Sequence, residues 1–432
     1  MERILTKRRA DSSKYPSGRQ VRDLTNEFHE STSRVSSRTW WICGFLFLAT
    51  VLNYLDRQVL SLTADKIIGE FGLTKEGFGK IIAAFRYSYG IVQIFGGFLV
   101  DTHGPRITYP AAGGLWSLAG LLTGLSSSVA MLSSFRFLLG VGEAFNWPCA
   151  LKVTQSLLPP KDRPLANGIF NSGAAVGALL APLIVTLVTV YYGWRAAFVI
   201  TGALGGLWVV GWLWYTRGSG DELKGAALPF GPALRLTGRI LGMRAFWMLA
   251  VSAIVVNSAN FYLADWIPLY LKSSRGFAFA AGNILSIAVY AGISSGNILV
   301  GLFVRNLVGK GLPVYLAKRR ALLVSCVFMS MAVPAGFTPY RYLALVCLVL
   351  TGAGVAGFLV LYLTFVQDLD LAHVGVTSGL LGGLGNLAYG LCSPYIGRLS
   401  DIHETFLIFI FIGLLPWLAF FAILWGIREM KP

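Results

Sequence analysis

Apolar segments of about 20 residues recur along this chain of 432 residues, and they restrict its fold more than any other feature. A run of that length spans the hydrocarbon core of a bilayer as a helix. Hydrophobic residues make up 55% of the chain and charged residues 13%, whereas a soluble domain carries roughly 25% charge. We therefore predict an all-α integral membrane protein. The twelve predicted spans cover residues 40–68, 77–100, 107–126, 130–157, 165–190, 196–216, 243–271, 279–305, 319–337, 342–367, 375–397 and 405–427.

The longest non-apolar stretch inside the chain covers residues 217–242 and divides the spans six and six. This division predicts an N-terminal six-helix bundle over residues 40–216, a cytoplasmic linker over 217–242 and a C-terminal six-helix bundle over 243–427. Residues 1–39 are polar and lack the apolar core of a cleaved signal peptide, so we expect a disordered tail. We expect the last five residues to form a short cytoplasmic end.

The net charge of +16 would suit a nucleic-acid partner, but the positive residues are distributed as in a membrane protein. By our placement of the spans, 24 of the 36 Lys and Arg residues fall on one side of the membrane. Nine of them lie within the first 39 residues. Positive charge gathers on cytoplasmic loops, so both termini are expected in the cytoplasm of a multi-pass cell (inner) membrane protein. The predicted partner is the lipid bilayer and not nucleic acid, and we expect a monomer.

The sequence contains no recognisable motif for enzyme catalysis, metal binding or nucleotide binding. The five cysteines fall within predicted spans without metal-ligand spacing. No phosphate-binding Gly-Lys-Ser/Thr loop appears, and no nucleophile–base pair stands out. We therefore predict neither an enzyme nor a bound cofactor. The four histidines lie in the tail or in predicted loops, so carboxylates would have to carry any transferred proton.

Asp56 and Arg57 place two opposite charges inside the first apolar helix. Ionisable side chains at membrane depth are costly, and they usually face a cavity or mark a pathway for a substrate or protons. A structural ion pair that locks two helices together is the alternative interpretation. Arg57 is the candidate anchor for an anionic substrate, because guanidinium stays charged when buried and pairs bidentately with carboxylate.

A second buried carboxylate, Glu143, lies seven residues after Arg136 in the fourth span. Two helical turns separate them, so the two side chains share one face. Glu143 and Asp56 are the candidate proton carriers, and a static pair of Glu143 with Arg136 is the alternative. Asp265 lies in or near the seventh span and is either a third titrating group or a residue at the outer mouth.

Several uncharged polar side chains in the spans are candidates for binding substrate hydroxyls. Each of them is as well explained by helix packing. They are Tyr89 and Gln93 in span 2, Asn171 and Ser172 in span 5, and Asn386 in span 11. Arg86 and Lys152 also lie in spans, where long basic side chains can extend toward the membrane surface.

Five residues at the end of the second span and just after it have the spacing Gly-x-Leu-x-Asp-x-x-Gly-x-Arg. This pattern resembles the loop 2–3 signature of the major facilitator superfamily. The five residues are Gly97, Leu99, Asp101, Gly104 and Arg106. More narrowly, the chain is similar to the anion:cation symporter family, in the branch of hexuronate and related sugar-acid transporters. The matching segments are residues 53–57, 136–148, 168–175 and 193–198, and more weakly 266–270, 275–277 and 373–386.

The resemblance implies twelve helices in two bundles and proton-coupled uptake of an organic anion, typically a hexuronate or aldonate. It assigns proton coupling to Asp56 and Glu143 and substrate contact to Arg57, Tyr89 and Asn386. Asp101, Arg106, Arg136 and Asp265 are the expected gating or structural residues. Leu269 stands where relatives often carry Lys, and Asp265 stands where they tend to be uncharged, so this mouth is more acidic than usual.

The function expected from the sequence is therefore secondary transport of a small anionic substrate with protons. Two alternatives stay open. One is an exporter or antiporter for organic anions or drugs, and the other is a membrane sensor that binds its ligand without moving it.

Overall fold

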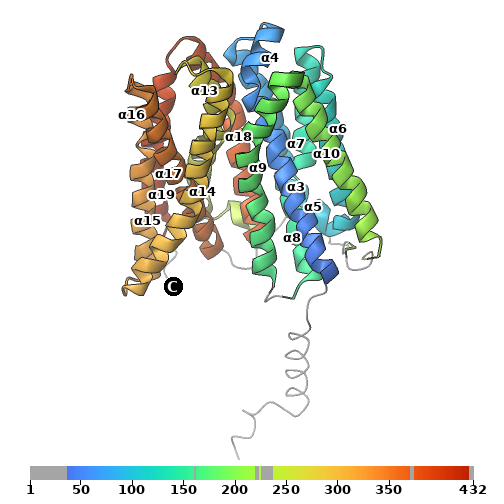
Figure 1. Ribbon diagram of the computed structural model, residues 1–432. Helices are drawn as coiled ribbons and strands as arrows, with labels where there is room; N and C mark the ends of the chain where they lie inside the picture. The colour runs from blue at the N-terminus through green and yellow to red at the C-terminus, as the bar shows by residue number, and fades with distance from the viewer. Residues whose placement is uncertain (1–36, 160–161, 219–222, 225–236, 370–373, 428–432) are drawn as a thin grey trace, which may run out of the picture.

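The computed structural model describes residues 37–159, 162–218, 223–224, 237–369 and 374–427 of the chain. The described part is helical and contains no strand, and its long helices run roughly parallel in two groups (Figure 1). Residues 1–36 of the predicted tail, most of the predicted linker and the last five residues lie outside the described residues, whereas residues 37–39 already belong to the first helix. All twelve predicted spans have a helical counterpart, so the fold class is confirmed.

Six spans form the N-terminal bundle, drawn from blue to green in Figure 1. One of them is split into α7 and α8, and a short helix, α4, follows the first span. The helices are α3 (Ser37–Leu62), α4 (Ala64–Phe71), α5 (Lys75–His103), α6 (Pro105–Gly124), α7 (Val129–Glu143), α8 (Asn146–Leu157), α9 (Arg163–Tyr192) and α10 (Trp194–Tyr215). A 3-10 turn, η2 (Thr216–Gly218), follows α10.

The other six spans form the C-terminal bundle, drawn from yellow to red. Two of them are divided, into α12 with α13 and into α15 with α16. The helices are α12 (Arg244–Asp265), α13 (Ile267–Ser273), α14 (Phe279–Gly309), α15 (Val314–Met329), α16 (Ala332–Phe337), α17 (Arg341–Leu369), α18 (Val374–Asp401) and α19 (Thr405–Ile427).

Among the residues that the structure describes, length and hydropathy alone identify nine helices able to cross a membrane, against twelve predicted spans. The fourth span falls below the length limit because α7 ends at Glu143 and α8 begins at Asn146. Pro148 has no N–H to donate to the carbonyl of Ala144, which explains a break at this point. The continuous helix predicted over 130–157 is therefore wrong, and the interruption directly follows Glu143.

The first span is also shorter than predicted. Instead of continuing to residue 68, α3 ends at Leu62 and α4 starts at Ala64. The hydroxyl of Thr63 donates to the carbonyl of Val59 at 2.6 Å. Such a bond from a Thr side chain to the preceding turn favours a bend in a helix. α4 therefore lies at one end of the molecule, which we call the α4 end; the opposite end is the α8 end (Figure 1).

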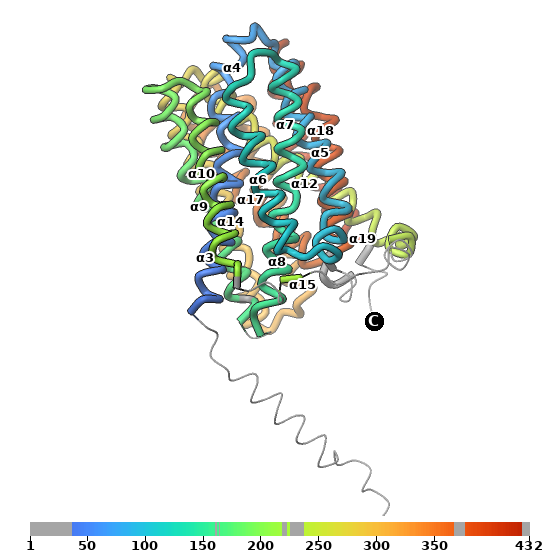
Figure 2. The backbone as a smooth tube through the Cα atoms, turned by 90° about the vertical axis from the view of Figure 1, so that its right-hand side faces the viewer, coloured from blue at the N-terminus to red at the C-terminus, as the bar shows by residue number. Residues whose placement is uncertain are grey.

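The two bundles meet most closely along α5 and α18, which run side by side (Figure 2). Glycines make this approach possible. A side chain on Gly79 would collide with the backbone of Ser393, and one on Gly397 with the backbone of Lys75. Small residues allow membrane helices to pack at short distance in this way. α9 and α14 form the second contact between the bundles.

Polar contacts between the bundles gather in the half of the molecule nearer the α4 end. The ammonium of Lys272 donates to Asp65 at 2.8 Å, and the hydroxyl of Ser61 donates to the carbonyl of Asp265 at 2.8 Å. Further bonds join Asn283 to Thr186, Tyr290 to Gln58 and Lys75 to Asp401. The structure is therefore closed at the α4 end.

Candidate functional site

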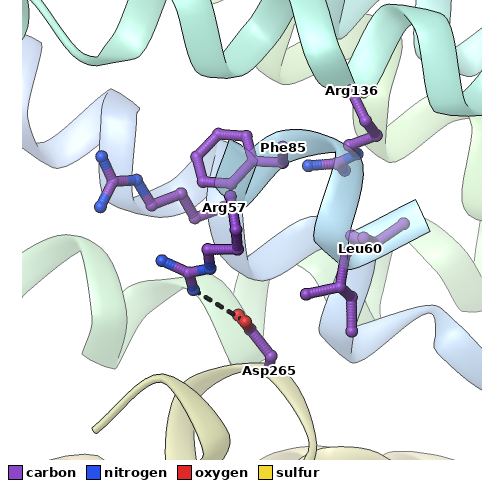
Figure 3. Close-up of a pocket in the computed structure, with 7 residues that line it drawn as sticks. Arg57, Leu60, Phe85, Arg136 and Asp265 are labelled. Atoms are coloured by element: carbon purple, nitrogen blue, oxygen red, sulfur yellow. Dashed lines mark hydrogen bonds and ion pairs between the residues drawn. The ribbon is translucent and has the colours of Figure 1, made fainter. Parts of the chain in front are cut away.

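A pocket lies between the bundles, and seven side chains from four helices line it (Figure 3). Three of these side chains are arginines, and the one carboxylate among them comes from the C-terminal bundle. The lining residues are Arg57 and Leu60 of α3, Ile82, Phe85 and Arg86 of α5, Arg136 of α7 and Asp265 of α12. Three guanidinium groups around one cavity make it a strong candidate for binding an anion.

Arg57 is held by Glu143 and by aromatic rings. Its Nε donates to Oε2 of Glu143 at 2.6 Å. The guanidinium carbon lies 4.6 Å from the ring centre of Tyr89 and 5.2 Å from that of Tyr54. Glu143 is completely buried, whereas 15% of the Arg57 side chain is exposed. Arg57 therefore faces the pocket, and its ion-pair partner Glu143 is buried and does not line the pocket.

Asp56 is not the partner of Arg57, although the two are neighbours in sequence. Successive residues point about 100° apart on a helix, so Asp56 is turned away from the pocket. It is 2% exposed. Neither of its carboxylate oxygens has a hydrogen-bond partner among the described residues. The charged pair predicted within this helix is replaced by one between α3 and α7.

Arg136 is buried on the same face of α7 as Glu143, but no direct ion pair joins the two in the part of the chain that the structure describes. Its guanidinium carbon lies 4.9 Å from the ring centre of Phe198. Its Nε and one Nη have no hydrogen-bond partner within the described ranges. The alternative of a static Arg136–Glu143 pair is therefore wrong.

A second charged cluster joins the two bundles. Nη2 of Arg86 donates to Oδ2 of Asp265 at 2.7 Å, the contact dashed in Figure 3. Nη1 of Arg86 donates to Oδ1 of Asn386 at 3.3 Å, and Nδ2 of Asn386 donates to Gln93 at 3.1 Å. Arg86 and Gln93 belong to α5, whereas Asp265 and Asn386 belong to α12 and α18. Asn386 and Gln93 thus extend the same network along the contact between α5 and α18.

The other predicted residues lie elsewhere. Asn171 and Ser172 are exposed on α9, and the Ser172 hydroxyl donates to the carbonyl of Ile169 in its own helix. Asp101 pairs with Lys152 of α8 at 2.7 Å. The backbone N–H of Arg106 donates to the carbonyl of Leu223 at 3.2 Å, so the chain after α10 is tied to the start of α6.

Arg86 is the main pocket residue whose role the sequence did not reveal. It lies in an apolar span three residues before Tyr89, so the two share one face of α5. An intramembrane arginine is a signal of a functional site by itself. What the sequence could not supply was its partner, because Asp265 lies 179 positions away on another helix.

The sequence profile of the Major Facilitator Superfamily matches residues 46–388. The chain belongs to this superfamily. It is a multi-pass membrane transporter of that fold. It is 26% identical to the hexuronate transporter of Escherichia coli (strain K12), covering 92% of this chain and 96% of that protein. It is 29% identical to the hexuronate transporter of Bacillus subtilis (strain 168), covering 90% and 94%.

Further comparisons agree on the fold. A probable galactarate/D-glucarate transporter of Escherichia coli (strain K12) is 27% identical over 89% of this chain and 94% of its own length. The crystal structure of the D-xylose-proton symporter superposes with a TM-score of 0.72 at 15% identity, covering 91% of this chain and 99% of that one. A bacterial homolog of the human lysosomal transporter Spinster, inward-facing and unoccupied, gives a TM-score of 0.69 at 20% identity, covering 90% and 98%.

Proposed function

We propose that this protein is a proton-coupled symporter that imports an organic anion, a hexuronate or a related sugar acid, by alternating access. Three kinds of observation support the proposal. The relatives are named for hexuronates and aldarates. The pocket between the bundles presents three arginines. Two buried carboxylates, Asp56 and Glu143, lie in the helices that build it.

The observation that carries the proposal is the hydrogen bond of 2.6 Å between Arg57 and Glu143. An anionic substrate and the Glu143 carboxylate compete for one guanidinium. Removing one partner of a buried ion pair leaves an unpaired charge, which is strongly unfavourable. Protonation of Glu143 removes its charge and makes Arg57 available to the substrate. Binding of the anion is in this way linked to uptake of a proton.

Asp56 provides for a second proton. One proton carried with a monoanion moves no net charge across the membrane. Two protons move one positive charge, which is worth about 2.3 kcal/mol per 100 mV, or roughly fifty-fold in accumulation. The dependence of uptake on membrane potential therefore distinguishes the two stoichiometries. Uptake that is independent of the potential argues against a proton on Asp56.

The proposal takes the α8 end as cytoplasmic and the α4 end as the outside, because positive charge gathers on cytoplasmic loops. On that assignment, the polar contacts at the α4 end belong to the state that is closed outward. In the proposed cycle, the outward-facing state takes protons on Asp56 and Glu143, and the sugar acid then binds Arg57. The bundles rock, the α4 end closes, and loss of the protons inward returns Arg57 to Glu143.

The first experiment uses purified protein in liposomes with an external pH probe. Galacturonate, glucuronate and galactonate are added in turn. External alkalinisation with one of them supports proton symport and identifies the substrate. No change in external pH with any of the three, in vesicles that hold oriented protein, contradicts the proposal. Alkalinisation that appears only with an opposite substrate gradient would favour an exporter, and binding without flux would favour a sensor.

A further inference from the structure

Arg86 differs from the other two arginines of the pocket because its carboxylate partner comes from the opposite bundle. Arg86 belongs to α5, and Asp265, which accepts its hydrogen bond at 2.7 Å, ends α12. Asn386, its second acceptor, also belongs to the C-terminal bundle. When the bundles separate at the α4 end, both acceptors move away together. Arg86 is then left facing the pocket without an anion.

In the closed state Arg86 is buried against side chains of the opposite bundle. The side chain is 4% exposed. Its guanidinium carbon lies 3.8 Å from the ring centre of Phe261 and 5.3 Å from that of Tyr389. Its Nε has no hydrogen-bond partner among the described residues. In the closed state the guanidinium is therefore confined by rings of the C-terminal bundle, which move away together with Asp265 and Asn386 when the bundles separate.

Arg57 and Arg86 lie close enough to bind the two ends of one sugar acid. Their guanidinium carbons are 5.6 Å and 5.4 Å from the ring centre of Phe85, so they are at most about 11 Å apart. A six-carbon chain has five C–C bonds of about 1.5 Å, so its end carbons lie up to roughly 6 Å apart. A hydrogen-bonded carboxylate adds about 4 Å to the guanidinium carbon at each end. A six-carbon diacid can therefore reach both arginines.

We infer that Arg86 is a second anion subsite, which Asp265 occupies when the α4 end is closed. The transporter therefore selects sugar monoacids over diacids. The inference rests on the proposed function. A monoacid bound to Arg57 leaves Arg86 free to receive Asp265 when the α4 end closes. The second carboxylate of a diacid occupies Arg86 and leaves Asp265 without a cation. A buried charge without a partner is unfavourable, so the loaded diacid opposes closure.

The test compares galacturonate with galactarate, which share one carbon skeleton and differ in a second carboxylate. Dissociation constants are measured on the purified full chain by calorimetry, and each ligand is also tested in vesicles. Wild type should bind galacturonate more tightly than galactarate. Asp265→Asn keeps the size of the side chain and removes its charge. It should shift the ratio of the two dissociation constants at least tenfold toward galactarate.

Asp65→Asn is the matched control. Asp65 also pairs across the bundles, with Lys272 at 2.8 Å, but it does not line the pocket. This variant loosens the same end of the molecule without touching the subsite, so it should shift the ratio clearly less than Asp265→Asn does. The double variant Arg86→Gln with Asp265→Asn removes the subsite together with its carboxylate. It should lose the gain in galactarate binding.

Three outcomes overturn the inference: an unchanged ratio in Asp265→Asn, an equal shift in Asp65→Asn, or a wild type that binds galactarate as tightly as galacturonate. The third outcome is measured on wild type, so the inference can be tested even if Asp265→Asn folds poorly. Failure of the proposed function is seen separately. Galacturonate flux without protons contradicts the symport but not the selectivity, whereas proton-coupled uptake with an unchanged ratio contradicts the selectivity alone.

Discussion

Two arginine–carboxylate pairs lie around the same pocket, one inside a bundle and one between bundles. Arg57 and Glu143 both belong to the N-terminal bundle and are 2.6 Å apart. Arg86 and Asp265 come from different bundles and are 2.7 Å apart. The two pairs are almost equal in length and burial, but rigid-body motion of the bundles affects them differently. It leaves the first intact and must break the second.

The two pairs therefore respond to different events, the first to protonation and the second to movement of the bundles. A pair within one rigid body can be opened only by changing its charge, which is what protonation of Glu143 does. A pair between two bodies changes with their relative position, so it biases the equilibrium between states. Variants of the first pair should therefore alter coupling and affinity, and variants at the contact between the bundles should alter the population of the closed state.

The largest effect is expected for Glu143→Gln. The amide cannot release a proton, so uptake driven by a pH gradient should stop. Accumulation should fall from at least about tenfold per pH unit to none, because each proton carried with the substrate is worth about 1.4 kcal/mol per pH unit. Exchange of labelled for unlabelled substrate should persist, since Arg57 remains. Glu76→Gln, a partly exposed carboxylate of α5 paired with Lys80 and away from the pocket lining, is the control. A Glu143→Gln protein that still concentrates substrate would rule out its role.

Arg57→Lys should come next. Lysine keeps the positive charge but lacks the planar fork that binds a carboxylate with two hydrogen bonds. Hydrogen bonds to charged groups contribute about 1.5–3 kcal/mol, so substrate affinity should fall roughly ten- to hundredfold. Equilibrium binding measures this loss directly. Unchanged affinity in Arg57→Lys would show that the anion binds another of the three arginines.

A smaller effect is expected from alanine at two glycines of the same helix, Gly79 and Gly97. A Cβ on Gly79 would collide with the Ser393 backbone of the other bundle, whereas nothing lies within 4 Å of one on Gly97. Overpacking costs about 1–3 kcal/mol. Gly79→Ala should therefore depopulate the state closed at the α4 end about five- to hundredfold, with Gly97→Ala unchanged.

Distances between spin labels on α4 and α13 report this population. Both variants gain the same helix propensity from alanine, so the comparison isolates the contact between bundles. Equal distance distributions in the two proteins would mean that α5 and α18 do not control closure.

Much of the fold was predictable because bilayer thickness sets the length of each apolar run. The start of α19 at Thr405 and the end of span 9 at Phe337 agree with the predicted limits. The breaks at Thr63 and after Glu143 were missed, because they depend on a side-chain hydrogen bond and on one proline. At the site, the charged residues could be identified one by one. Their pairing could not, because it depends on which way neighbouring helices face each other.

The smallest effect is expected at a third ion pair, which ties α4 to α10 within the N-terminal bundle. Glu70 accepts hydrogen bonds from Trp194 at 2.6 Å and from Arg195 at 2.5 Å. These two donors lower the pKa of the Glu70 carboxyl below its usual value of 4.5. A carboxyl with a lowered pKa stabilises the fold above its unfolded pKa, and this contribution is lost as the pH falls through the folded value.

Glu70→Gln should therefore weaken thermal stability slightly at neutral pH, by no more than about 1 kcal/mol for an exposed pair. The difference from wild type should disappear in acid, well below pH 4.5. Because the pair lies inside one bundle and away from the pocket, transport and closure at the α4 end should not change. A shift in the distance between α4 and α13 in this variant would show that pairs within a bundle also set the conformational equilibrium.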